Sequence, residues 1–227
     1  MRILTQPKAP SYSQSEAITR MALKLVMFSD FICPFCYIGF ETVRKLKPEF
    51  DLEIEWRGFQ IHPDWPAEGM PASEFRREMD PETRRAIWAR IEAMAEATGF
   101  SIKSPEVLTN SRIALEAAEF AKECGKGEEF EGRVFKAYFN EGLNIGGQGV
   151  IADLAADVGI DRNDLNVAIE SNRYGMRLSN NTMVARTRGV DGVPTFFVGD
   201  YPMVGAQSED TMRQILHRYQ RLSASAK

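Results

Sequence analysis

The chain has 227 residues, of which 44% are hydrophobic and 26% are charged, and its formal net charge is −4. This length and composition predict a globular protein made of one large domain, or of one domain that carries a substantial insertion. An overall basic surface for nucleic acid is absent, and no apolar run approaches the roughly 18 residues of a membrane-spanning helix. We therefore expect neither nucleic acid nor a membrane as a partner.

The first twenty residues are polar, and we expect residues 1–20 to form a flexible tail. They lack the apolar core of a secretory signal, which predicts a cytoplasmic protein. Met21 directly precedes the first expected strand and is a candidate for the true start of the chain. Three cysteines do not predict a framework of disulfides in the cytoplasm, where a Cys-x-x-Cys pair indicates catalysis or metal binding.

A β-α-β unit is predicted after the tail. Residues 23–29 are apolar and branched and indicate a buried strand. Apolar side chains then recur at helical spacing over residues 34–47, with Pro34 at the first helical position and Pro48 expected to end the helix. Residues 52–59 alternate in polarity and predict a second strand. The Cys-Pro-Phe-Cys motif therefore lies at the junction of strand and helix.

The middle of the chain predicts helices alone. Asp80 and Pro81 are a strong start signal for a helix that ends at Gly99. Further helices are expected at about 110–124, 128–140, 148–158 and 161–188, the last with a potential break near 172–175. Because sheet-forming patterns are absent, we expect residues 65–179 to form an inserted helical domain.

Strands return near the C-terminus. Residues 195–198 and 202–204 flank a Gly199-Asp200 turn and predict a hairpin. A final helix is expected from Ser208, its N-cap, to about Leu222.

The two ends of the chain together predict the fold. Residues 21–64 and 180–227 supply the order β-α-β … β-β-α. This is an α/β, thioredoxin-like fold with a large all-helical insertion.

The chemistry expected of the motif is disulfide exchange, which requires a thiolate because the thiol is a poor nucleophile. Cys33 lies at the start of a helix, where unpaired N–H groups and the helix dipole stabilise an anion. We therefore predict Cys33 as the attacking sulfur and Cys36 as the resolving one. Phe35 brings no charge, which predicts a milder oxidant than a Cys-Pro-His-Cys enzyme.

Gly192-Val193-Pro194-Thr195 is the second element. A proline at the entry to a strand can adopt the cis form, and in this fold its loop would lie beside the cysteines. The backbone of Val193 could then pair with an extended substrate peptide. We count Val193, a cis Pro194, Pro34 and Phe35 as substrate-binding candidates.

The sequence resembles the DsbA family, and most of all its FrnE-like branch. The resemblance covers about residues 23–220 and rests on the stretches SDFICPFCYIG, EWRGFQIHPDWPAEG, NSRIALEAAEFA, VFKAYFNEG and GVPTFFVGDYPMVGAQS. It implies a thioredoxin fold with a helical insertion, and dithiol–disulfide exchange by Cys33 and Cys36 with Pro194 as the cis-proline. It implies no metal and no bound cofactor, with glutathione as a candidate co-substrate. Expected partners are protein or small-molecule thiols and disulfides, and the expected state is a monomer or homodimer.

Two residues depart from that branch. Phe35 stands where tryptophan is usual, and Ala114-Leu115 stands where relatives often have Ala-His. Related glutathione-dependent isomerases usually have serine at the first cysteine position, so Cys33 argues against their activity.

Simpler interpretations remain for several residues. The motif could be half of a zinc site completed by Cys124, His62 or His217, but these offer no second closely spaced pair. Cys124 is expected to be a partly buried structural thiol. Asp30 is a candidate proton relay, although a capping role toward the backbone is favoured. His62 and His217 are expected to be ordinary polar residues.

Two further patterns are assigned structural roles. The aromatic residues Phe130, Phe135, Tyr138 and Phe139 are expected to pack in the core. The glycine-rich residues 142–149 lack the context of a dinucleotide-binding loop and predict a connection between helices.

The function expected from the sequence is that of a thiol–disulfide oxidoreductase or isomerase. The alternatives are a chaperone-like peptide-binding protein and a glutathione-dependent isomerase of a small aromatic substrate.

Overall fold

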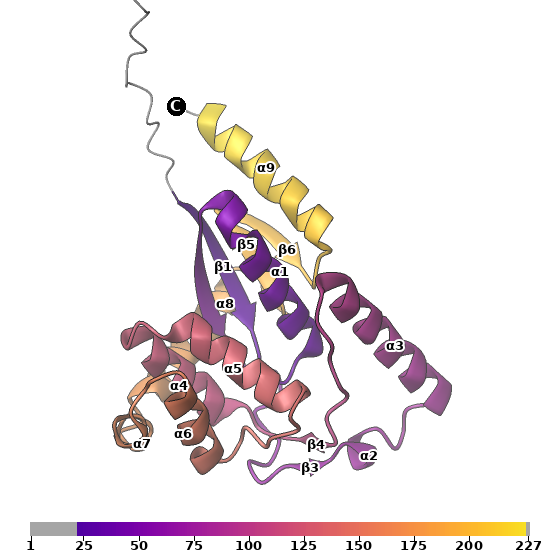
Figure 1. The fold of residues 1–227 in the computed structure, drawn as a ribbon, viewed down its shortest axis with the longest axis vertical. Helices are drawn as coiled ribbons and strands as arrows, with labels where there is room; N and C mark the ends of the chain where they lie inside the picture. Colours follow the sequence, from indigo (N-terminus) through magenta and orange to yellow (C-terminus); the bar gives the residue numbers. More distant parts are fainter. Residues whose placement is uncertain (1–21, 226–227) are drawn as a thin grey trace, which may run out of the picture.

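The computed structural model describes residues 22–225, and Figure 1 shows their fold. The predicted tail and the candidate start at Met21 lie outside the described residues. Four strands form the main sheet in the order β2-β1-β5-β6. They are β1 (Leu23–Ser29), β2 (Leu52–Gly58), β5 (Thr195–Val198) and β6 (Tyr201–Val204).

The register of the sheet joins the two ends of the chain. Strand β1 pairs in parallel with β2 and antiparallel with β5, so that Met27 lies between Trp56 and Phe196. β6 completes the predicted hairpin with β5. Leu25, Met27 and Phe28 of β1 are fully buried because this central strand is covered on both faces. The predicted β-α-β … β-β-α order is confirmed.

Helix α1 (Pro34–Phe50) follows β1 and begins at Pro34 as predicted. The expectation that Pro48 ends it is wrong. Pro48 lies in the last turn, where a missing N–H costs one hydrogen bond, and the buried Phe50 anchors the end of the helix. Asp51, in the left-handed conformation with φ of 52°, terminates it by donating its N–H to Lys47.

The predicted helices of the middle region are confirmed. They are α3 (Pro81–Thr98), α4 (Arg112–Glu123), α5 (Gly127–Phe139), α6 (Gln148–Asp157), α7 (Arg162–Glu170) and α8 (Arg173–Thr187). The carboxylate of Asp80 accepts the Thr83 N–H at 2.8 Å, as an N-cap should. Asn172, with φ of 53°, provides the break between α7 and α8.

A short antiparallel pair corrects the expectation that the insertion has no strands. Strands β3 (Met70–Pro71) and β4 (Val107–Leu108) pair beside the short helix α2 (Ala72–Phe75). Segments of two residues are too short to show an alternating pattern in the sequence. The boundary placed between residues 179 and 180 falls within α8 and stays a prediction.

Packing around α1 ties the elements together. Helix α9 (Glu209–Ser225), helix α3 and helix α5 all contact α1, while α4 and α6 lie next to α5 and α7 packs on α4 and α6 (Figure 1). The Thr211 N–H donates to the Ser208 side chain at 3.2 Å, which confirms this N-cap. The residues expected to be core aromatics are buried, namely Phe130, Phe135, Tyr138 and Phe139.

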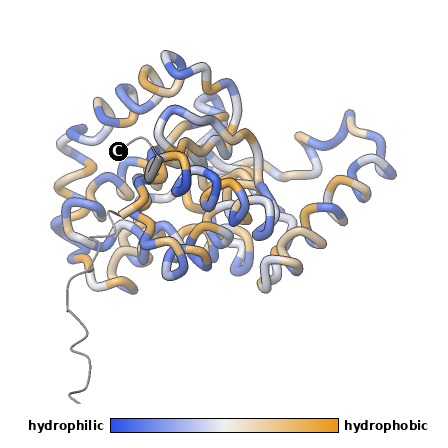
Figure 2. Tube along the Cα trace, turned by 90° about the horizontal axis from the view of Figure 1, so that it is seen from above, coloured by the Kyte–Doolittle hydropathy of each residue, from blue (hydrophilic) through white to orange (hydrophobic). Residues whose placement is uncertain are grey.

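Most helices alternate between hydrophobic and hydrophilic residues along the chain, so one side of each can face the core (Figure 2). Within residues 22–225, no helix is long and apolar enough to cross a membrane.

Candidate active site at the junction of β1 and α1

Cys33 lies at the start of α1, where the chain leaves strand β1. Its backbone is extended, with φ of −93° and ψ of 115°, and it occupies the N-cap position immediately before Pro34. The carbonyl of Cys33 accepts the N–H groups of Cys36 at 3.0 Å and Tyr37 at 3.3 Å. The local sequence therefore places one sulfur at the positive end of a 17-residue helix.

The two cysteines have opposite acidities. A hydrogen bond with the Cys36 thiol is the main influence that lowers the pKa of Cys33, and backbone N–H groups of the first helical turn act in the same direction. Burial raises the pKa of Cys36 well above its ordinary value, and the neighbouring Cys33 raises it further. The thiolate is therefore favoured on Cys33, while Cys36 is held as the thiol.

Access to the two sulfurs also differs. Cys33 has 7% of its surface exposed, and Cys36 has none. Both are free thiols in this structure. The N–H of Asp30 points to the Cys36 sulfur at 3.5 Å. A molecule approaching from outside can therefore contact Cys33 first.

Asp30 lies beneath this loop and is fully buried. Its carboxylate accepts the N–H of Ile61 at 2.8 Å and that of Ile32 at 3.4 Å, so it ties the loop before Cys33 to the segment that follows β2. Burial raises the pKa of Asp30 to about 6. Its charge in turn opposes ionisation of Cys33. Asp30 therefore accepts hydrogen bonds from the backbone, as its favoured capping role predicts. Its role as a proton relay stays a prediction.

The loop before β5 reaches the cysteines from a distant part of the sequence. The Val193–Pro194 peptide bond is cis. The Cys33 sulfur donates to the carbonyl of Val193 at 3.7 Å across 160 positions of the chain. The Thr195 hydroxyl donates to the Gly192 carbonyl at 2.7 Å and closes the loop. Within residues 22–225, the main-chain N–H of Val193 has no hydrogen-bond partner.

An apolar cavity of about 250 Å³ adjoins the motif. Pro34 and Phe35 line it together with residues of later segments, namely Trp65 of the loop after β2, Phe75 of α2, Met79 between α2 and α3, and Ile87 of α3. Phe75 is 50% exposed and Ile87 is 44% exposed. The sequence alone does not predict this apolar surface, because the residues that line it come from separate segments of the chain that only the fold brings together.

The sequence also did not predict the aromatic layer behind the motif. Phe31 stacks on Trp56 of β2 with ring centroids 4.9 Å apart, and Tyr37 stacks on Phe135 of α5 at 5.1 Å. These contacts fix the segments on either side of Cys33. The aromatic residues next to the motif were a signal for such packing.

Other candidate residues lie elsewhere. Cys124 is exposed rather than partly buried, because α4 ends at Glu123 and Cys124 lies beyond its packed face. His217 packs against Phe50. His62 stacks on Trp65 at 3.9 Å, and burial lowers the pKa of its imidazole.

The zinc interpretation needs at least three ligating side chains in one place. Among residues 22–225 no group of three or more His, Cys, Asp or Glu side chains is arranged to hold a metal ion.

Comparisons with known proteins agree with this geometry. The family model of the DSBA-like thioredoxin domain matches residues 24–217. The uncharacterized protein YwbO of Bacillus subtilis (strain 168) is 30% identical over 199 residues, which cover 86% of this chain and 96% of YwbO.

Solved structures resemble the chain over most of its length. The probable DsbA oxidoreductase SCO1869 from Streptomyces coelicolor is 22% identical with a TM-score of 0.79, and the alignment covers 87% of this chain and 89% of that one. The cytosolic disulfide reductase DsbM from Pseudomonas aeruginosa with GSH is 16% identical with a TM-score of 0.63, covering 90% and 98%. These two similarities support the fold.

Proposed function

The chain belongs to the DSBA-like thioredoxin domain family of protein-disulfide oxidoreductases, and we propose that it exchanges disulfides with Cys33 as the attacking and Cys36 as the resolving sulfur. The observation that carries this assignment is the asymmetry of the pair. Cys33 combines a lowered pKa with a residual exposure of 7%, whereas the pKa of Cys36 is raised and the whole residue is buried.

The proposed reaction has two displacement steps. The Cys33 thiolate attacks one sulfur of a substrate disulfide, which forms a mixed disulfide and releases the first thiolate to take a proton from water. Cys36 then loses its proton and attacks the Cys33 sulfur, which breaks the mixed disulfide and releases the second thiol. Two electrons pass from the cysteine pair to the substrate, and the reverse sequence oxidises a dithiol.

Two features support a protein segment as the substrate. The unpartnered N–H of Val193 lies beside Cys33 and can donate to the carbonyl of an extended chain. The apolar cavity next to Phe35 can take a hydrophobic side chain near the substrate cysteine. Pro194 and Pro34 present no charged side chain to the sulfurs.

The test compares single cysteine variants in insulin reduction and in oxidative refolding of a reduced protein. Cys33→Ser should abolish both activities, because the variant lacks the attacking sulfur. Cys36→Ser should stop turnover but accumulate mixed disulfides visible by mass spectrometry. Cys124→Ser is the matched control, since it removes a thiol far from the site, and it should retain full activity. Full activity of Cys33→Ser would refute the assignment.

We infer that the cycle operates in the cytoplasm with glutathione as the small-molecule thiol. The fold shared with a cytosolic disulfide reductase solved with GSH supports this. In a stopped assay, reduced glutathione should regenerate the dithiol from the oxidised protein. If glutathione leaves the oxidised protein unchanged while dithiothreitol reduces it, another donor is required.

A chaperone-like activity is the second candidate, and the exposed Phe75 and Ile87 near the motif favour it. The Cys33→Ser, Cys36→Ser double variant separates the two functions. It should still suppress aggregation of a denatured protein if peptide binding is an activity of its own, and loss of suppression would reject this candidate.

A further inference from the structure

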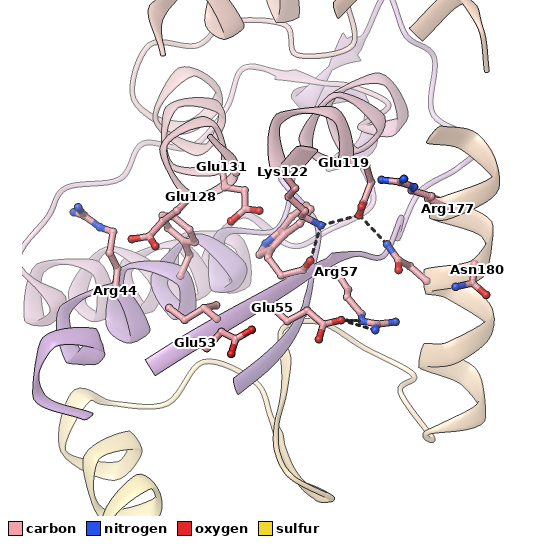
Figure 3. Close-up of a pocket in the computed structure, with 15 residues that line it drawn as sticks. Arg44, Glu53, Glu55, Arg57, Glu119, Lys122, Glu128, Glu131, Arg177 and Asn180 are labelled. Carbon is pink, nitrogen blue, oxygen red and sulfur yellow. Dashed lines mark hydrogen bonds and ion pairs between the residues drawn. The ribbon is translucent and has the colours of Figure 1, made fainter. Parts of the chain in front are cut away.

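A second cavity, of about 570 Å³, lies apart from the cysteine pair between edge strand β2 and helices α4, α5 and α8 (Figure 3). Five consecutive residues of β2, 53–57, form one wall. No residue of the Cys-Pro-Phe-Cys motif or of the cis-proline loop lines it. The disulfide chemistry therefore does not explain this cavity.

Glu131 reaches into the cavity from α5 and is its least expected feature. Only 4% of its surface is exposed, yet its carboxyl has no hydrogen bond or ion pair with any residue of the described chain. Buried carboxyl groups are normally paired, because an isolated charge is costly away from water. This carboxyl therefore lacks a partner that a ligand can supply.

The charges around Glu131 favour a positive partner. Three carboxylates act on it, Glu119 from α4 and Glu128 and Glu129 from α5, against the one ammonium of Lys122. Glu53 of β2 also lines the cavity, and within residues 22–225 its side chain makes no hydrogen bond or ion pair. The guanidinium groups at the rim are already paired, with Arg44 on Glu41, Arg57 on Glu55 and Arg177 on Glu123.

The wall already accommodates one ammonium group. The Lys122 ammonium lies 5.1 Å from the centroid of the Trp56 ring and donates to the Trp56 carbonyl at 2.6 Å and to Glu119 at 2.8 Å. Phe40 adds a second aromatic ring to the lining. Aromatic faces combined with carboxylates are the usual surroundings of bound organic cations.

We propose that this cavity binds an alkylammonium group, with Glu131 as its counter-ion. Glu131 supplies the charge, and Trp56 and Phe40 supply apolar contact for the attached carbon chain. The same group could be carried by a free diamine or by a lysine side chain of a peptide lying along the open edge of β2. The proposal does not rest on the redox activity, because no residue of the cysteine motif or of the cis-proline loop lines this cavity.

Proton release should accompany binding. Burial raises the pKa of Glu131 to about 8, so at pH 7 the carboxyl is mostly protonated and must ionise to pair with the cation. An alkylammonium keeps its proton up to about pH 10. The affinity should therefore rise by about tenfold from pH 7 to pH 9 and then level off.

The experiment is isothermal titration calorimetry of the full chain with cadaverine and with a short peptide containing one lysine, and pentane-1,5-diol is the neutral control. Saturable binding of either ammonium ligand, without binding of the diol, is expected. Tighter binding of cadaverine identifies a free diamine as the source, and tighter binding of the peptide identifies a lysine side chain.

Two matched variants test the role of Glu131. Glu131→Gln keeps the shape of the side chain and should weaken binding by about tenfold or more and remove its pH dependence. Glu129→Gln removes a charge from the exposed face of the same helix and should change affinity less than about twofold. Insulin reduction should be unchanged in both variants. The proposal is overturned if neither ammonium ligand binds, if the diol binds equally well, or if Glu131→Gln binds like the wild type.

The Trp56 indole resonance gives a second measurement, which holds even if Glu131→Gln is less stable. Its N–H is buried without a partner in the cavity wall and should shift on titration of the wild type with cadaverine. An unshifted Trp56 signal at saturation would contradict the assigned location.

Discussion

The stability of the protein should depend on pH through Glu131. This buried carboxyl has no compensating hydrogen bond, and burial raises its pKa from 4.5 to about 8. In the unfolded chain the same group ionises near its ordinary pKa. Replacing it by glutamine removes the ionisation while keeping nearly the same volume, so Glu131→Gln isolates this one contribution to the free energy of unfolding.

The sign follows from the protons bound in each state. Between pH 4.5 and 8 the unfolded chain has lost the Glu131 proton and the folded chain still holds it, so stability falls as the pH rises through this range. Each unit of pKa shift corresponds to about 1.4 kcal/mol. The wild type should therefore lose roughly 3–4 kcal/mol more than Glu131→Gln between pH 5 and pH 8, a large part of the stability of a typical domain.

Urea unfolding followed by far-ultraviolet circular dichroism at pH 5 and pH 8 measures this difference. Contributions from other groups, such as Asp30, are common to both proteins and cancel. Glu129→Gln is the control for loss of a charge on the same helix. It should follow the wild type closely at both pH values, because Glu129 is the weakest of the charged groups that act on Glu131. Equal losses of stability in the wild type and in Glu131→Gln would show that Glu131 ionises freely in the folded protein and would refute the reasoning.

Three further substitutions test the redox site. Phe35→His should lower the pKa of Cys33 and raise the reduction potential, because an imidazolium would stabilise the thiolate; Phe35→Leu should change neither, as measured against glutathione redox buffers. Above pH 6 the Asp30 carboxylate is ionised and opposes ionisation of Cys33, so Asp30→Asn should lower the pKa of Cys33. The ultraviolet absorbance of the thiolate measures this pKa, and an unchanged Cys33 titration would exclude electrostatic coupling between Asp30 and Cys33. Phe75→Ser should reduce kcat/KM for insulin by about threefold to tenfold without affecting glutathione disulfide, whereas the distant, exposed Val167→Ser should affect neither.

Local sequence signals correctly predicted where the helix after the cysteine motif and the helix after Asp80 begin. Pro34 at the first helical position and Asp80 as an N-cap act through their own backbone surroundings, so the sequence around them is sufficient. Pro48 shows where such signals fail. Proline disfavours a helix interior in general, but packing of Phe50 in the core outweighs one lost hydrogen bond at the end of α1.

Features that depend on several distant segments could not be predicted in this way. Glu131 lies between Phe130 and Gly132 in a helix with many charged residues, and nothing in that pattern distinguishes it from its exposed neighbour Glu129. Its burial results from the approach of β2 and α4 to α5. The apolar surface around Phe75 similarly depends on the β3–β4 pair, whose two-residue strands are too short to be predicted from the sequence.

The same contact that separates the acidities of the two cysteines can drive the second step of the proposed exchange. While Cys33 is a thiolate, its charge and its hydrogen bond with the Cys36 thiol help to raise the pKa of Cys36. Formation of the mixed disulfide removes that charge and occupies the Cys33 sulfur, so both influences disappear. Burial still opposes ionisation of Cys36, but the Asp30 N–H at 3.5 Å remains to stabilise the new thiolate. Cys36 therefore becomes more acidic at the stage when it must attack, and it stays protonated in the resting dithiol.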